Sequence, residues 1–148
     1  MAMTNEEKYN HWLAVATYDL ETAQHMLHSG RYAYVAFASQ QAIEKLVKAL
    51  HVLYTGNEAP KTHNIKYIFD LIFGNPNNVE KITEETFSQE AEKYSDLFGR
   101  LHLYYISERY SIYKRKISEA LNHEIASKLL QETEEAFTWL QSLKEYWK

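Results

Sequence analysis

A row of polar side chains interrupts an otherwise apolar stretch that follows Phe37. Steps of one and four residues place its members on one face of a helix, where neighbouring groups can act together. The members are Gln40, Gln41, Glu44, Lys45 and Lys48. Two amides, a carboxylate and two ammonium groups could together bind a charged ligand. The same spacing also allows a solvated face with a Glu44–Lys48 ion pair worth about a few tenths of a kcal/mol, and both interpretations stay open.

A second group of candidate residues lies in "RLHLYYISERYSIYKRK", the stretch Arg100–Lys116. Tyrosine rings can stack on bases and arginine can form paired hydrogen bonds with phosphate, so this composition suits a nucleotide or a short single strand. The candidates for binding are Arg109, Tyr110 and Lys114. Residues 108–118 carry a net charge of +3 in a chain whose net charge is −4. Tyr104 and Tyr105 are expected to be core rings instead.

Other kinds of chemistry find no support in the sequence. The chain has no Cys, which excludes thiolate nucleophiles, disulfides and Cys-ligated zinc. The spacing motifs of serine hydrolases and of phosphate-binding loops are missing from the sequence as well. His25 and His28 could share a metal ion, but no carboxylate is spaced with them as a third ligand. We therefore interpret them as complements to the end of a helix dipole, and we expect neither a metal site nor a cofactor.

The composition is that of a folded helical domain. Hydrophobic residues make up 45% and charged residues 24% of the 148 residues, with only four Gly and two Pro. The longest uncharged run, Tyr32–Ile43, is much shorter than the roughly 20 residues that span a membrane. The N-terminus lacks the pattern of a signal peptide, and a pI near 6.0 argues against broad, non-specific nucleic-acid binding. We expect one domain over residues 1–148, in the cytoplasm and without a membrane segment.

The elements that must position these candidates are helices. Thr4 and Glu7 have the spacing of a capping box, and the first helix should end at Ser29-Gly30. The further helices are expected at about 31–54, from Thr62 or Asn64 to Phe73, at about 83–107, and after Asn122, with an irregular connection from Glu108 to Leu121. Apolar residues at helical spacing predict these inner faces: Leu13, Ala16, Leu20, Ala23 and Leu27; Val35, Ala38, Ala42, Leu46, Ala49 and Leu53; and Ile125, Leu129, Ala136, Leu140, Leu143 and Trp147.

These helices predict an all-α fold, an up-and-down bundle of four long helices plus one or two short ones. The second long helix carries apolar residues, among them Phe37, Val47 and Val52, on more than one side. Something must cover the second apolar side, and another subunit would do so. The sequence therefore predicts a homodimer.

Several stretches together resemble the HEPN family of small helical domains. They are "WLAVATYDLETAQHML" at 12–27, "GRYAYVAFASQQAIEKLVKAL" at 30–50, "THNIKYIFDLI" at 62–72 and "YYISERY" at 104–110. The F-x-x-Q-Q-A-x-E-K-x-x-K-A pattern beginning at Phe37 and the later Thr62-His63 pair are fairly specific when they occur together. The resemblance implies a helical bundle that pairs as a two-fold dimer. It also implies nucleotide binding, and a small nucleotidyltransferase partner in a toxin–antitoxin pair.

Many members of the family that the chain resembles are metal-independent ribonucleases, with an Arg followed by His after four to six intervening residues. Arg109 matches the arginine, but the corresponding later positions are Lys114, Arg115 and Lys116. Two hypotheses follow. The first is a non-catalytic dimeric module for a nucleotide or a nucleotidyltransferase, in which the polar row orders a groove near Arg109. The alternative is a ribonuclease toxin with a degenerate site, in which His63 or His102 supplies the missing imidazole.

Overall fold

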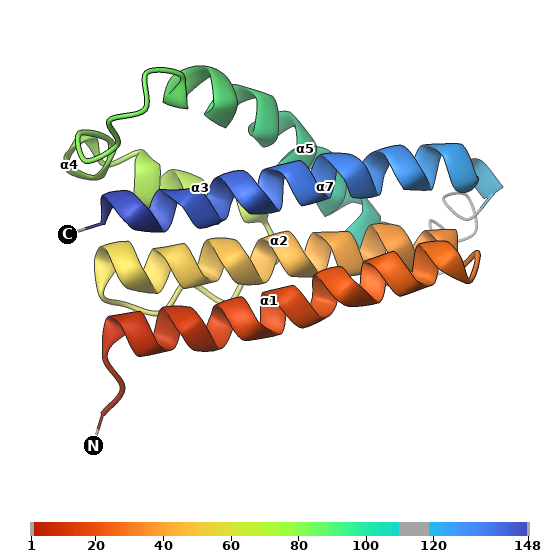
Figure 1. Cartoon of the computed structure of the whole chain (residues 1–148), viewed down its shortest axis with the longest axis horizontal. Helices are drawn as coiled ribbons and strands as arrows, with labels where there is room; N and C mark the ends of the chain where they lie inside the picture. The colour runs from red at the N-terminus through yellow and green to blue at the C-terminus, as the bar shows by residue number, and fades with distance from the viewer. Residues whose placement is uncertain (1, 110–118, 148) are drawn as a thin grey trace.

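The arrangement of helices is seen in a computed structural model that describes residues 2–109 and 119–147, without the side chains of residues 107–109. Every regular element within these residues is helical, and the four long helices run alternately in opposite directions (Figure 1). The predicted all-α up-and-down bundle is therefore confirmed. The elements are α1 (Asn5–His28), α2 (Tyr32–Thr55), α3 (Ile65–Phe73), α4 (Pro76–Val79), α5 (Phe87–Arg109), α7 (His123–Ser142) and the 3₁₀ helix η1 (Leu143–Tyr146).

Capping side chains fix where several helices begin. The Thr4 hydroxyl accepts the backbone N–H of Glu7 at 3.1 Å, and the Glu7 carboxylate accepts the N–H of Thr4 at 3.2 Å, so the predicted capping box is confirmed. Asn64 caps α3 and Asn122 caps α7 in the same way. At the other end of α2, Gly56 has φ 77°, a left-handed conformation that suits glycine.

The predicted boundaries differ from the observed ones at three places. The helix α5 begins at Phe87 rather than near Thr83, and it continues to Arg109, inside the stretch expected to be irregular. Most of that stretch, residues 110–118, lies outside the described residues. The one-turn helix α4 forms where a break was expected, because Asn75 caps it and proline suits a first helical position. The last helix ends at Ser142 and tightens into η1.

The helix α2 lies at the centre of the bundle and contacts α1, α3, α5 and α7. All six residues of its predicted inner stripe are buried, and so are Val47 and Val52 on other sides. The second apolar side of this helix is thus covered by the chain itself, except at Phe37, which is half-buried. That feature no longer indicates a subunit, and the expected homodimer rests on the family resemblance alone.

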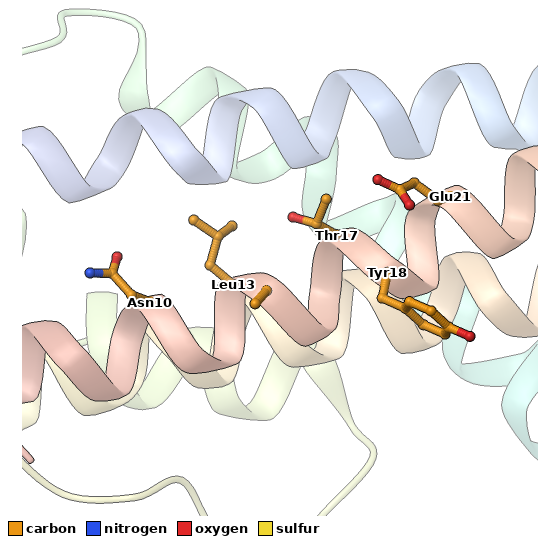
Figure 2. Close-up of a pocket in the computed structure, with 6 residues that line it drawn as sticks. Asn10, Leu13, Thr17, Tyr18 and Glu21 are labelled. Atoms are coloured by element: carbon orange, nitrogen blue, oxygen red, sulfur yellow. The ribbon is translucent and has the colours of Figure 1, made fainter.

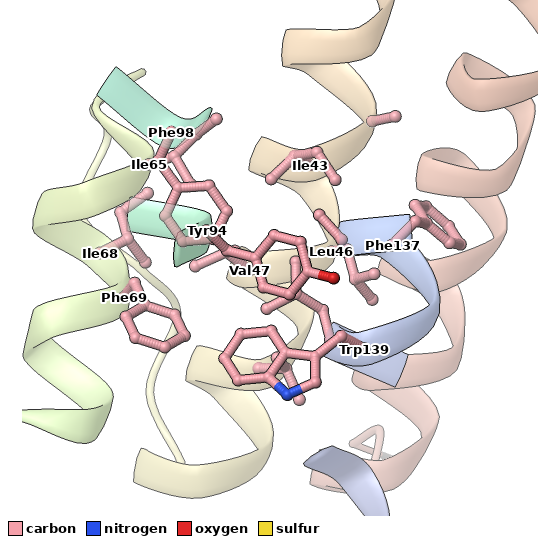
Figure 3. Close-up of a cluster of buried hydrophobic side chains, with 14 of the residues drawn as sticks. Ile43, Leu46, Val47, Ile65, Ile68, Phe69, Tyr94, Phe98, Phe137 and Trp139 are labelled. Atoms are coloured by element: carbon pink, nitrogen blue, oxygen red, sulfur yellow. The ribbon is translucent and has the colours of Figure 1, made fainter. Parts of the chain in front are cut away.

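Aromatic rings fill the space where α3, α5 and α7 meet over α2 (Figure 3). The Trp139 ring centre lies 5.1 Å from that of Tyr94 and 6.0 Å from that of Phe69. Rings at such separations contribute dispersion and quadrupole attraction beyond the area they bury. On the outside, Arg100 Nη2 donates to Glu132 Oε2 at 2.5 Å and ties α5 to α7. This bond ties the beginning of the candidate stretch Arg100–Lys116 to α7.

The C-terminal end of the chain is held by a buried tyrosine. The Tyr54 hydroxyl donates to the backbone carbonyl of Leu143 at 2.5 Å. Burial raises the pKa of Tyr54, so the phenol stays protonated and keeps its donor. This bond fixes η1 against the end of α2.

The inner face predicted for the last helix is wrong at its first turn. Ile125 is 45% exposed, whereas Ala126 and Leu130 are buried there. A helical turn of 3.6 residues drifts against a strict repeat, so the buried stripe moves by one residue toward this end of α7. On α1, Ala16 and Ala23 are buried as expected. The three leucines of the predicted α1 stripe, Leu13, Leu20 and Leu27, are only half-buried. Trp147, the last residue of the face predicted for the last helix, is half-buried too.

No helix within the described residues combines the length and the apolar composition that crossing a membrane requires.

Candidate functional site

The polar row of α2 is largely removed from solvent. Gln40 is 0% and Glu44 is 1% exposed, while Gln41, Lys45 and Lys48 are half-buried. A solvated face is therefore excluded for the two buried members. Burying a carboxylate and an amide costs free energy unless each is hydrogen-bonded, so their partners decide what the row does.

Glu44 is the centre of a hydrogen-bonded cluster. Its Oε1 accepts the Gln40 side-chain amide at 2.9 Å and lies 3.0 Å from His63 Nδ1. Its Oε2 accepts Lys48 Nζ at 2.9 Å. A carboxylate in its usual ionised form can only accept hydrogen bonds, so its contact with His63 Nδ1 requires a hydrogen on that nitrogen. The network thus assigns the tautomer and the orientation of the imidazole.

The amides extend this cluster across to α1. Gln40 Nε2 also donates to the backbone carbonyl of His63 at 3.2 Å, and its Oε1 accepts Gln41 Nε2 at 2.6 Å. Gln41 Oε1 accepts Lys45 Nζ at 3.0 Å, and Lys45 forms an ion pair with Asp19 of α1 at 3.4 Å. We call these seven residues the Glu44 network: Asp19, Gln40, Gln41, Glu44, Lys45, Lys48 and His63.

The segment between α2 and α3 is held at several points by this side of the bundle. The network binds both the ring and the carbonyl of His63, directly before α3. Further along, Lys48 Nζ lies 5.9 Å from the centre of the Trp12 ring, and Trp12 Nε1 donates to Glu58 at 3.1 Å. His51 Nδ1 lies 2.8 Å from the carbonyl of Asn57. The polar row therefore orders the connection that carries His63.

His63 also belongs to a stack of three rings. Its ring centre lies 4.2 Å from that of Tyr105, with 24° between the planes. Tyr105 in turn lies 6.2 Å from Phe37, with 16° between the planes. Tyr105 is 9% exposed, so the expectation of a core ring is confirmed there, whereas Tyr104 is only half-buried at the edge of the core. The side chain of His63 is 45% exposed, which makes it the outer member of the stack.

The sequence prediction for the basic end of α5 can be placed only through the backbone. Arg109 is the last residue of α5, four residues after Tyr105. One helical turn is 3.6 residues, so the two positions lie on the same side of α5. The Arg109 side chain, Tyr110 and Lys114 lie outside the described residues.

The proposed binding row did not include His63, Asp19 or Tyr105 as members, although the structure joins them to it. No sequence pattern indicates Asp19, because it is 26 residues away from Lys45 and belongs to another helix. A pattern does indicate His63, since the Thr62-His63 pair is fairly specific when it occurs together with the Q-Q-A-x-E-K pattern. The direct contact between Glu44 and His63 explains physically why the two would occur together.

Other features of the described residues do not form a second site. No group of three or more His, Asp or Glu side chains within them is placed to hold a metal ion. A hollow lies along α1, where Leu13 and Thr17 point toward α7 and Tyr18 points away (Figure 2). It is shallow and open, and it shares no residue with the Glu44 network. His102 Nδ1 is buried and has no hydrogen-bond partner among the described residues.

Comparison with known proteins identifies one family. The family model described as HEPN domain matches residues 9–143. Neither the comparison with curated proteins nor the comparison with solved structures finds a match. The match begins inside α1, extends past the end of α7 and includes the whole Glu44 network.

Proposed function

The chain belongs to the HEPN domain family, and from this premise we propose that it is a non-catalytic, dimeric module that binds a nucleotide or a short RNA through its phosphate. The Glu44 network supports this proposal more than any other observation. Its buried carboxylate and amides donate to and accept from each other, and they hold the connection before α3 in place. A carboxylate and amides engaged in this way position the groups around them, which suits a binding surface.

The proposed phosphate contact is Arg109, which Tyr110 and Lys114 follow in the sequence. The Glu44 network would order the surface around His63 and Tyr105, with Gln41, Lys45 and Lys48 at its half-buried edge. An arginine in a locally positive segment of an otherwise acidic chain attracts phosphate and binds it through two hydrogen bonds. The same module would serve a small nucleotidyltransferase, the protein partner implied by the family in toxin–antitoxin pairs.

Arg109→Ala is expected to weaken binding of ATP and of short RNA about ten- to a hundredfold. The loss corresponds to a charge-assisted contact of roughly 1.5–3 kcal/mol. Lys114→Ala should cost less and should mainly reduce the salt dependence, because a lysine acts as a point charge that salt screens. Calorimetric titration of wild type and both variants measures these effects. Equal affinities in all three proteins would show that Arg109 does not bind the ligand.

A second expected result is a homodimer. Two-fold pairing is what the family implies, and a stable interface buries upwards of about 1,000 Å² in total. The exposed apolar residues Tyr67 and Leu71, one turn apart on α3, offer surface for such a contact. Sedimentation equilibrium at micromolar concentration should give twice the chain mass of 17.5 kDa. Monomer alone over that concentration range would refute the dimeric part of the proposal.

A ribonuclease is the second candidate, because His63 is oriented by a buried carboxylate. With Nδ1 held 3.0 Å from Glu44 Oε1, the opposite ring nitrogen could take the proton of a ribose 2′-hydroxyl while Arg109 steadies the phosphate. The two candidates differ in the fate of the bound RNA. The binding module leaves it intact, and the ribonuclease cuts it without a metal ion.

A further inference from the structure

We propose that the His63 ring is a stacking platform for the nucleobase of the bound ligand. The inference rests on the proposed function, since it names the part of the ligand that the same surface recognises. His63 would hold the base, whichever group holds the phosphate.

Among the described residues, no further ring continues the stack beyond His63. One face of the His63 imidazole lies against Tyr105, with the ring centres 4.2 Å apart, and its Nδ1 edge lies against Glu44. The side chain is nevertheless 45% exposed. The exposed area must therefore come from the opposite face and the outer edge of the ring. A further aromatic ring can stack on that outer face of His63 and so continue the stack of Phe37, Tyr105 and His63.

His63 is also held rigid before any ligand arrives. Its carbonyl accepts Gln40 Nε2 at 3.2 Å and its Nδ1 binds the buried Glu44 carboxylate, so both the backbone and the ring are restrained. Binding to an exposed side chain ordinarily costs the entropy of fixing its rotamer. The rotamer of His63 is already fixed in the folded protein, so its ring face is preorganised for a base.

The negative charge of Glu44, at the edge of the His63 ring, is balanced by a lysine. Lys48 Nζ pairs with Glu44 Oε2 at 2.9 Å, so the carboxylate that orients His63 does not present an uncompensated negative charge to a phosphate-bearing ligand. A base stacked on a flat aromatic ring is recognised by its area rather than by its hydrogen-bonding edge. We therefore expect purines to bind more tightly than pyrimidines.

The test compares ATP with inorganic tripolyphosphate, which offers the phosphates without a base. Wild type should bind ATP about tenfold more tightly than tripolyphosphate, within the range measured for stacking of one base on an aromatic side chain. His63→Asn keeps an N–H donor at the position of Nδ1 and removes the ring. This variant should bind tripolyphosphate within about twofold of wild type and should lose most of the preference for ATP.

Two further variants separate stacking from a structural role. His63→Phe restores a ring without the Nδ1 donor and should retain the preference for ATP. His11→Asn makes the same exchange at an exposed position of α1 and should change neither affinity. If His63→Asn is too unstable to titrate, His63→Phe carries the test, and loss of the ATP preference in a folded His63→Phe protein would overturn the proposal.

The outcomes also separate this inference from the proposed function. If His63→Asn keeps the full preference for ATP, the ring only fastens the connection before α3, and the inference fails while phosphate binding stands. If wild type binds neither ATP nor tripolyphosphate, the proposed function fails and the inference fails with it. Titration with an adenylate dinucleotide shows whether the base belongs to a free nucleotide or to an RNA: binding tighter than that of ATP, again weakened by His63→Asn, identifies RNA.

Discussion

Leu46→Ala is expected to lower the free energy of unfolding by about 2–5 kcal/mol, the range for truncating a buried leucine. Leu46 is 0% exposed on α2, and it faces the aromatic cluster formed by α3, α5 and α7 (Figure 3). Because α2 is enclosed by four other helices, the surroundings cannot collapse easily into the cavity. Urea unfolding followed by circular dichroism measures the loss.

The control for this substitution is Ile125→Ala, at an exposed apolar position outside the surface of α3 proposed for the dimer contact. Ile125 is also in a helix, α7, but it is 45% exposed. The change there should stay within about half a kcal/mol, as is usual at surface positions. A loss as small as this at Leu46 would show that the central helix is not packed as described.

Glu44→Ala is expected to cost about 3 kcal/mol, the lower end of the range for removing one partner of a buried ion pair. The substitution leaves Lys48 and the Gln40 amide without their main acceptor and frees the His63 ring. The lower end applies because the side chain of Lys48 is 12% exposed and can turn toward water. Thermal and urea unfolding should both show the loss.

Asp70→Ala tests the same kind of ion pair at the surface. Lys66 and Asp70 are also four residues apart, but their side chains are 45% and 54% exposed. Exposed pairs contribute at most about 1 kcal/mol, so this variant should remain close to wild type. Similar losses in Glu44→Ala and Asp70→Ala would contradict a structural role for the Glu44 network.

Much of the fold could be predicted because it depends on local chemistry. The Thr4–Glu7 capping box and the asparagine caps of α3 and α7 involve residues three apart in sequence, so spacing alone reveals them. The inner stripe of α2 is long and strictly periodic, and all of it is buried. Prediction failed where tertiary packing decides, as at Ile125, whose exposure depends on which helices lie beside the first turn of α7.

The candidate site could be predicted only in part, for the same reason. Spacing showed that Gln40 and Glu44 share a helix face, but periodicity counts a polar residue as outward-facing. Their burial depends on His63, which lies 23 and 19 residues further along the chain. The Tyr105 ring comes from a helix whose approach to α2 no local pattern encodes. The sequence thus contains the parts of the network, and only the fold reveals that they satisfy one another.

The proposal that the Glu44 network orders a binding surface and performs no chemistry is tested most directly by following one RNA. A short, end-labelled RNA is incubated with wild type and with Arg109→Ala in the absence of divalent ions. Native gels report binding, and denaturing gels report cleavage. We predict that wild type binds the RNA, that Arg109→Ala binds it about ten- to a hundredfold more weakly, and that the RNA stays full-length with both. Cleavage by wild type that disappears in His63→Asn would contradict this account and identify the protein as a ribonuclease.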